Sequence, residues 1–302
     1  MNLSGVYPAL TTPFAADGSV SLGDLKYNIE RYNSTGLAGY VVIGSTGESV
    51  LLSRSETDSI LATVKEAAGQ GKRLIAGTGA ESTAETIERT KRAAELGYHL
   101  ALVKTPYYYK PAYKPEVLIA HYRRVADASP IPVLLYSVPI FTGVTLEAPE
   151  VAALSEHPNI VGIKDSSGHV MRVGEMVAMA QPDFQVLTGS APTLLAGLTV
   201  GAKGAILALA SGLPEKCLEL FDLARSGSRS ESLEKARNLQ NVLLKVSKVV
   251  ASEHAIAGLK FLMDQRGYRG GIPRLPLVPI SDAYKQRILE SLASLEPAAA
   301  RA

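Results

Sequence analysis

The sequence contains one cysteine and no tryptophan. A single cysteine, Cys217, excludes a disulfide within the chain, and we expect a reducing, cytoplasmic environment. Cys217 lies at a predicted helix start, where a small packed side chain is a better interpretation than a nucleophile. The first residues lack a basic segment followed by an apolar one, so we expect no secretion signal.

The chain also lacks an excess of either charge. Its 31 Lys and Arg residues against 29 Asp and Glu residues give a net charge of +2, which predicts no nucleic-acid partner and no binding to a membrane surface. No apolar run reaches the roughly 18 residues of a membrane-spanning helix. The 5 histidines form no pair at metal-ligand spacing, so we expect no metal.

The sequence does contain a repeated alternation of short apolar runs and amphipathic segments. The apolar runs are continuous, which indicates strands that are buried on both faces and therefore a parallel sheet. Ser82 and Glu85 have the spacing of a capping box and predict the start of a helix. We expect eight strands, near residues 6–11, 39–43, 73–76, 100–104, 133–136, 160–164, 185–187 and 204–207.

This alternation predicts an α/β protein with a closed (β/α)8 barrel, the TIM barrel. A doubly wound open sheet is the alternative, because counting strands does not prove closure. The later part of the chain has helical patterns without strands. We therefore predict a catalytic barrel at residues 1–227 and a C-terminal helical extension at residues 228–302.

A lysine ends the sixth predicted strand, where a charged side chain is least expected. Lys164 follows the apolar run 160–163 and precedes Asp165 and a Ser-Ser-Gly turn. Burial disfavours an ammonium ion, and a neutral amine is a nucleophile that forms a Schiff base with a 2-oxo acid. The alternative is a lysine that extends from the strand end into solvent or into a salt bridge.

Polar residues follow other predicted strands, and in a TIM barrel all of these strand ends lie at the active-site face. The glycine-rich loop at residues 44–48 suits a small carboxylate, although it could be only a helix-capping turn. Three tyrosines at residues 107–109 could form a packing cluster or present a hydroxyl to a pocket or a neighbouring subunit. Tyr136 can relay a proton. Together with Lys164, these groups are the ones that a Schiff-base enzyme needs.

Four of these segments, at residues 44–48, 105–109, 136–139 and 162–168, resemble the dihydrodipicolinate synthase/N-acetylneuraminate lyase family. Their order and spacing are similar to those of the family along nearly the whole chain. The resemblance implies a TIM barrel, a small 2-oxo acid substrate bound as a covalent imine, no cofactor or metal, and a homotetramer.

The resemblance also implies roles for individual residues. Lys164 would form the imine, Tyr136 would be the general acid and base, and Ser45 and Tyr108 would complete the proton relay, with Tyr108 supplied by the adjacent subunit. The expected substrate-binding residues are Thr46, Ser166 and Ile206 from the resemblance, and Gly47, Gly189 and Ser190 from their places at strand ends.

Two positions bear on which reaction the chain performs. Dihydrodipicolinate synthases have an arginine where this chain has Phe141, and an asparagine where it has Ser137. Other segments, such as 80–83 and 157–162, are more similar to 4-hydroxy-2-oxoglutarate aldolase. We therefore expect a class I aldolase that cleaves a 4-hydroxy-2-oxo acid to pyruvate and an aldehyde. Phe141 removes a polar contact and favours a distal group less polar than a carboxylate.

Two alternatives stay open. The first is another reaction on the same fold: condensation of pyruvate with aspartate semialdehyde by a 4-hydroxy-tetrahydrodipicolinate synthase, or the dehydration or aldol cleavage of a sugar acid. The second is a non-enzymatic relative that only binds a 2-oxo acid. The presence of Lys164, Tyr136 and Tyr108 argues against this second alternative.

Overall fold

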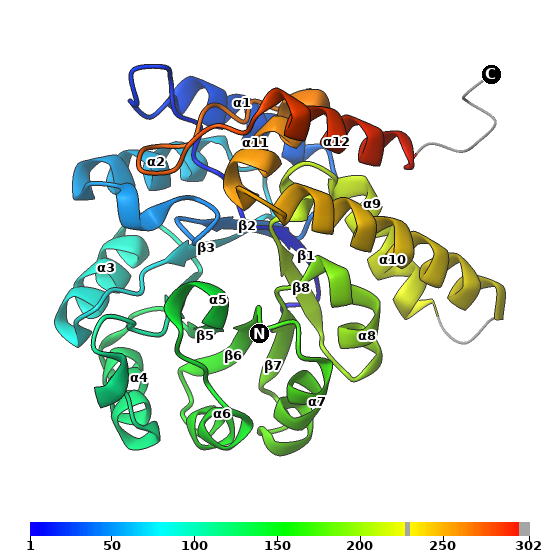
Figure 1. Ribbon diagram of the computed structural model, residues 1–302. Coiled ribbons are helices and arrows are strands. Elements are labelled where there is room, and N and C mark those ends of the chain that lie inside the picture. Colours follow the sequence, from blue (N-terminus) through cyan, green and yellow to red (C-terminus); the bar gives the residue numbers. More distant parts are fainter. Residues whose placement is uncertain (227–229, 296–302) are drawn as a thin grey trace.

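A computed structural model of the chain describes residues 1–226 and 230–295 (Figure 1). Within these residues, eight parallel strands form one sheet in the order β1-β8-β7-β6-β5-β4-β3-β2. The strands are β1 Gly5–Pro8, β2 Gly39–Val42, β3 Arg73–Gly77, β4 Leu100–Lys104, β5 Val133–Ser137, β6 Ile160–Asp165, β7 Gln185–Thr188 and β8 Gly204–Leu207.

Backbone hydrogen bonds between β1 and β2 close the sheet into a barrel. Ala38 N donates to Val6 O at 3.0 Å, and Leu10 N donates to Val41 O at 2.9 Å. The predicted TIM barrel is therefore confirmed, and the open sheet is excluded.

The first strand is shorter than predicted. It ends at Pro8, whereas the sequence pattern predicts a strand that continues to residue 11. Pro8 pairs with Leu207, the last residue of β8, so the ladder with β8 ends here, and beyond this point an isolated bridge between Ala9 and Val41 of β2 continues the pairing. The apolar pattern continues here because the chain stays buried after the ladder stops.

Helices surround the ring of strands in Figure 1. The α-helices of the barrel are α1 Leu22–Asn33, α2 Arg54–Ala67, α3 Thr83–Glu95, α4 Pro115–Ala128, α5 Pro139–Thr142, α6 Ala148–Ser155, α7 Val170–Met179, α8 Leu194–Thr199 and α9 Pro214–Arg225. Short 3-10 turns lie at η1 Ser49–Leu51, η2 Lys110–Ala112, η3 Ala191–Thr193 and η4 Leu209–Ser211.

Side-chain caps fix the starts of two helices near the site. Ser82 caps α3 as predicted, because its hydroxyl accepts from Glu85 N at 3.1 Å. The Glu85 carboxylate instead accepts from Arg89 Nε at 2.8 Å, on the same helix. A complete capping box is found at the start of α2, where Ser53 and Glu56 each bind the other's backbone N–H. Such caps typically stabilise a helix by about 1 kcal/mol.

The barrel interior is filled by apolar side chains that point inward from the strands. Gly162 keeps this interior narrow, since a Cβ there would lie 2.3 Å from Gln185 O. The interior side chains include Tyr7, Val41, Ile75, Leu102, Leu134, Leu187 and Ile206.

The C-terminal extension consists of α10 Ser230–Ala251, α11 Ala255–Gln265 and α12 Asp282–Ala293, which lie together on one side of the barrel (Figure 1). Helix α10 packs against α9, α11 and α12. The helical extension is thus confirmed, while the predicted boundary between residues 227 and 228 lies outside the described residues.

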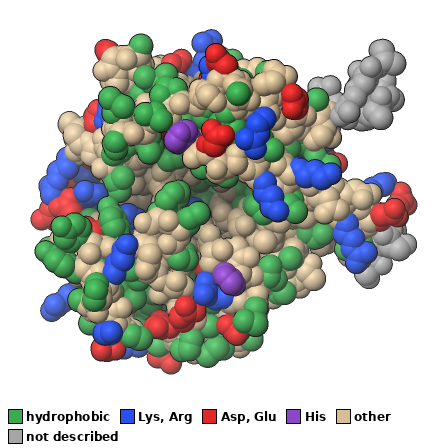
Figure 2. Space-filling view, viewed as in Figure 1, with side chains coloured by type: hydrophobic (Ala, Val, Ile, Leu, Met, Phe, Trp, Pro, Cys, Tyr) green, Lys and Arg blue, Asp and Glu red, His purple; other side chains and the backbone are tan. Residues whose placement is uncertain are grey.

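Both signs of charge are present on the face of the molecule that Figure 2 shows, where acidic and basic side chains are interspersed. Among the helices in the described part of the chain, none is both long and apolar enough to cross a membrane.

Candidate active site

Lys164 lies inside the barrel at the carboxyl end of β6. Its side chain is 4% exposed, and its Nζ lies 4.2 Å from the centroid of the Tyr136 ring. In the parallel ladders Lys164 pairs with Tyr136 of β5 and with Leu187 of β7. Paired residues of adjacent strands share a face of the sheet, so the three side chains point into the barrel together. This burial excludes a lysine that extends into solvent.

Two members of the predicted proton relay meet above Lys164. The Tyr136 and Ser45 hydroxyls are 3.5 Å apart, at the long limit of a hydrogen bond. Tyr108, in contrast, is 72% exposed within one chain, and its ring packs edge-on against Tyr109. Its backbone N–H donates to Glu81 Oε2 at 2.8 Å. The contribution of Tyr108 to the relay therefore stays a prediction.

The loop that carries Ser45 has a strained but fixed backbone. Ile43 and Glu48 both adopt left-handed conformations, with φ of 60° and 56°. A left-handed conformation costs a side-chain-bearing residue about 1–2 kcal/mol. The absence of a side chain at Gly77 makes room for the left-handed backbone at Ile43, since a Cβ at Gly77 would lie 2.0 Å from Ile43 O. Thr12 Oγ1 fixes the far end of the loop by donating to Gly47 O at 2.7 Å.

The structure gathers further predicted binding residues at the ends of β6 and β7. Gly189 N donates to Asp165 O at 2.6 Å, which joins the two strand ends. A Cβ on Gly189 would lie 2.0 Å from Ser166 Oγ, so only glycine leaves room for that hydroxyl. Ser190 follows directly, and Ile206 is buried in β8. Their roles in binding, like those of Thr46 and Gly47 on the β2 loop, stay predictions.

A buried ion pair that the sequence analysis missed connects the extension to the β2 loop. Glu48 Oε1 lies 2.6 Å from Lys260 Nζ of α11, and both side chains are almost completely buried. Lys260 also donates to Thr12 O at 2.8 Å and to Ile272 O at 2.7 Å. Arg274 N donates to Glu48 Oε2 at 2.8 Å. The helical extension therefore holds the loop that carries Ser45.

A second lysine, Lys104, was also missed as a site residue. It ends β4 and pairs with Tyr136 in the ladder, so it points into the barrel mouth. Burial lowers the pKa of Lys104 to about 8, with nearby Glu81 opposing and Arg89 adding to this shift. The signal that revealed Lys164, a lysine that ends an apolar strand, is present here as well.

The barrel mouth opens into a cavity of about 340 Å³. Its lining includes Ser45, Lys104 and Phe141, together with Ile256 and Leu277 from the extension. This volume falls in the range of small-molecule sites. No group of three or more His, Cys, Asp or Glu side chains in the described part of the chain is placed to hold a metal ion.

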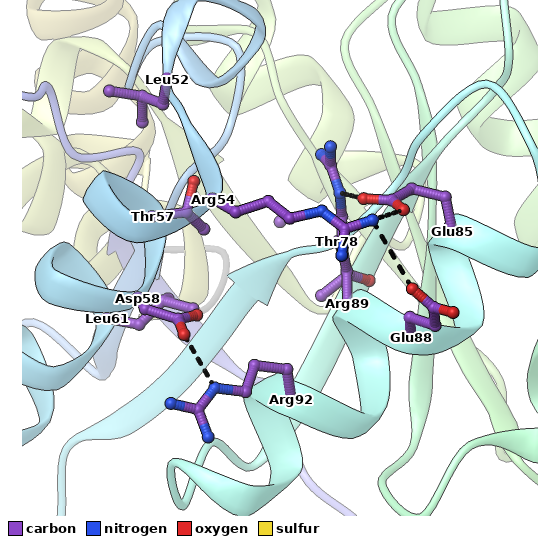
Figure 3. A pocket seen from close by; sticks show the side chains of 11 residues that line it. Leu52, Arg54, Thr57, Asp58, Leu61, Thr78, Glu85, Glu88, Arg89 and Arg92 are labelled. Atoms are coloured by element: carbon purple, nitrogen blue, oxygen red, sulfur yellow. Dashed lines mark hydrogen bonds and ion pairs between the residues drawn. The ribbon is translucent and has the colours of Figure 1, made fainter.

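Another pocket, of about 260 Å³, lies outside the barrel between α2 and α3 (Figure 3). Its charged side chains neutralise one another. Arg54 reaches Glu85 and Glu88, while Arg92 Nε lies 3.0 Å from Asp58. None of the side chains drawn in Figure 3 is one of the predicted catalytic groups.

Comparison with known proteins agrees with this arrangement. The model of the dihydrodipicolinate synthetase family matches residues 2–295. The chain belongs to this family. A 4-hydroxy-tetrahydrodipicolinate synthase of Exiguobacterium sp. is 37% identical over 289 residues, which cover 96% of this chain and 97% of that protein. A synthase of the same name from Xanthomonas campestris is 38% identical and covers 100% of this chain and 98% of its own length.

The solved structures of family members have the same fold. The crystal structure of the chloride-inhibited dihydrodipicolinate synthase from Acinetobacter baumannii, complexed with pyruvate, has a TM-score of 0.90 and 33% sequence identity. It covers 97% of this chain and 98% of that one. As a member of the dihydrodipicolinate synthetase family, the chain is an enzyme of the pyruvate-dependent Schiff-base lyase and synthase type, as predicted.

The narrower prediction of a 4-hydroxy-2-oxoglutarate aldolase finds no support among the relatives. They carry the name of the alternative, 4-hydroxy-tetrahydrodipicolinate synthase. The segments that favoured the aldolase are short, whereas the similarity to these synthases extends over nearly the whole chain. The argument against a synthase from Ser137 and Phe141 is not tested by these relatives, and it stays a prediction.

Proposed function

We propose that this enzyme joins pyruvate to an aldehyde through an imine on Lys164. The observation that carries the proposal is the placement of one amine. Lys164 Nζ is enclosed by the barrel and lies over the ring of Tyr136, whose hydroxyl faces Ser45. A buried amine beside a proton-relaying phenol is what imine chemistry on a 2-oxo acid requires.

The chemistry follows from these groups. Lys164 attacks the ketone carbon of pyruvate and water leaves, so the carbonyl oxygen is lost and a protonated imine forms. Loss of a methyl proton gives an enamine, whose carbon attacks the aldehyde carbon. Tyr136 gives a proton to the resulting alkoxide, and the proton is replaced through Ser45 and Tyr108. Hydrolysis of the imine restores Lys164, and no metal or organic cofactor takes part.

For the aldehyde partner, the first candidate is aspartate semialdehyde, the substrate of a 4-hydroxy-tetrahydrodipicolinate synthase, which is the name of the relatives. The second candidate is the reverse type of reaction, cleavage of a 4-hydroxy-2-oxo acid such as 4-hydroxy-2-oxoglutarate. Phe141 argues against the first candidate, because it occupies the cavity wall where synthases have an arginine.

The assembly proposal rests on Tyr108. Its ring is exposed at the edge of the barrel mouth, and Tyr109 beside it is 68% exposed. We expect Tyr108 to enter the site of a neighbouring subunit in a homotetramer. The predicted cytoplasmic location, and the absence of nucleic-acid and membrane partners, stay predictions.

The test compares Lys164→Ala with Lys203→Ala, which removes an exposed lysine before β8. Both variants are assayed for condensation of pyruvate with aspartate semialdehyde and for cleavage of 4-hydroxy-2-oxoglutarate. The proposal predicts that Lys164→Ala abolishes turnover and that Lys203→Ala retains it. Full turnover by Lys164→Ala would refute the mechanism, and the substrate that wild type turns over faster decides between the two reactions.

A further inference from the structure

Lys104 lines the cavity at the barrel mouth, and neither the imine chemistry nor a structural ion pair accounts for it. Its Nζ donates to Gly79 O at 2.7 Å and lies 5.3 Å from the centroid of the Tyr107 ring. Gly79 has to be a glycine for this approach, since a Cβ there would lie 2.6 Å from Lys104 N and 2.9 Å from its Cγ. The side chain is therefore held in a defined place.

The surroundings leave this ammonium group short of a counter-ion. The nearby Glu81 carboxylate already accepts hydrogen bonds from Tyr107 N at 3.0 Å and from Tyr108 N at 2.8 Å. Arg89 of α3 adds a repelling positive charge. Desolvation is the largest cause of the lowered pKa of Lys104, and an anion bound beside the amine would reverse this effect.

Lys104 lies where the inner and outer parts of the site meet. It lines the narrow inner chamber beside Tyr136 and also the outer cavity beside Phe141. Glu48, the other charged residue among the described residues that line these spaces, is already paired with Lys260. Lys104 is thus the charge that a substrate entering this cavity meets.

We propose that Lys104 binds the carboxylate at the distal end of the aldehyde partner and thereby sets specificity for acidic aldehydes. This inference rests on the proposed function, because it assumes that pyruvate is held at Lys164. The inference replaces the expectation, drawn from Phe141, that the distal group of the substrate is less polar than a carboxylate. The phenylalanine removes one polar contact at the outer wall, but a cation on β4 remains available for an acidic group.

The ladder geometry suits a substrate that bridges the two lysines. Lys104, Tyr136 and Lys164 are register partners on three successive strands. Neighbouring strands lie about 4.8 Å apart, so the outer two Cα atoms are separated by roughly 9–10 Å. An aldol attached to Lys164 would place its new hydroxyl near Tyr136 and its far end toward Lys104.

A competing role for Lys104 is that of the nucleophile itself, since a lowered pKa also activates an amine. The two roles differ in an observable way. As the nucleophile, Lys104 would carry the pyruvate adduct after borohydride reduction. As the carboxylate-binding group, it would remain unmodified while Lys164 carries the adduct.

The experiment uses Lys104→Met, the conservative Lys104→Arg, and Lys110→Met as a control that removes an exposed lysine from the same mouth. Each full-length variant is reduced with borohydride in the presence of pyruvate, and the adduct is located by intact mass and peptide mapping. Steady-state kinetics are then measured with two acidic aldehydes, aspartate semialdehyde and glyoxylate, and with the neutral acetaldehyde.

We expect Lys104→Met to keep the pyruvate adduct on Lys164 and to raise KM for acidic aldehydes by about ten- to a hundredfold, as loss of a charge-assisted hydrogen bond predicts. KM for acetaldehyde should stay unchanged, Lys104→Arg should recover part of the loss, and Lys110→Met should resemble wild type.

Three results would overturn the inference alone: an unchanged KM for acidic aldehydes, an equal change for acidic and neutral aldehydes, or a wild type that does not prefer acidic aldehydes. An adduct on Lys104 would overturn the inference as well, because Lys104 would then be the nucleophile. The absence of any adduct in wild type would instead refute the proposed function.

Discussion

Lys260→Met tests whether the extension holds the β2 loop through a buried ion pair. The substitution keeps most of the side-chain volume and removes the charge. It leaves the buried Glu48 carboxylate with the backbone N–H of Arg274 as its remaining donor among the described residues, and it removes the donor to Thr12 O and Ile272 O. Removing one partner of a buried ion pair typically costs about 3–5 kcal/mol, because the other charge is left unpaired.

The free energy of unfolding is measured by equilibrium urea denaturation at a fixed protein concentration. The control is Lys235→Met, which breaks the exposed pair of Lys235 with Glu231 at 2.7 Å and should change stability by less than about 0.5 kcal/mol. Adding Glu48→Gln to Lys260→Met removes the unpaired charge and should recover part of the loss. A loss below about 1 kcal/mol for Lys260→Met would refute the reasoning.

Three further predictions follow from single sites. Gly77→Ala places a Cβ 2.0 Å from Ile43 O, so we expect a loss of about 1–3 kcal/mol in thermal unfolding, and an unchanged stability would contradict it. Burial raises the pKa of Cys217 to about 12, so a thiol reagent should label it only after denaturation. The pKa of Lys104 is lowered to about 8, so kcat/KM for acidic aldehydes should fall as pH rises through about 8 and the ammonium is lost. In Lys104→Arg this fall should disappear, because a guanidinium keeps its charge.

Local patterns were sufficient to predict the barrel and the position of Lys164 at the end of one of its strands. Continuous apolar runs indicated buried parallel strands, and the placement of Lys164 at the end of one of them indicated the site. The same rule, applied to the fourth strand, would also have found Lys104. The predicted site residues of this segment were the tyrosines that follow it, although a lysine in that position is the stronger signal of an inward-facing charge.

Contacts between distant segments could not be predicted in this way. Glu48 and Lys260 belong to the β2 loop and to α11, and nothing in either segment indicates the other. The proposed role of Lys104 in substrate preference was not predicted for a related reason. Phe141 alone could be compared with a family pattern. The charge that the cavity offers to a substrate comes from Lys104, which lies on β4, and the sequence around Phe141 does not indicate that the two side chains line the same cavity.

The most direct test of the central claim is borohydride reduction of the wild-type enzyme with pyruvate, followed by intact-mass measurement and peptide mapping. The account predicts one pyruvate-sized adduct per chain, located on Lys164. The absence of an adduct, or an adduct on another lysine, would contradict it.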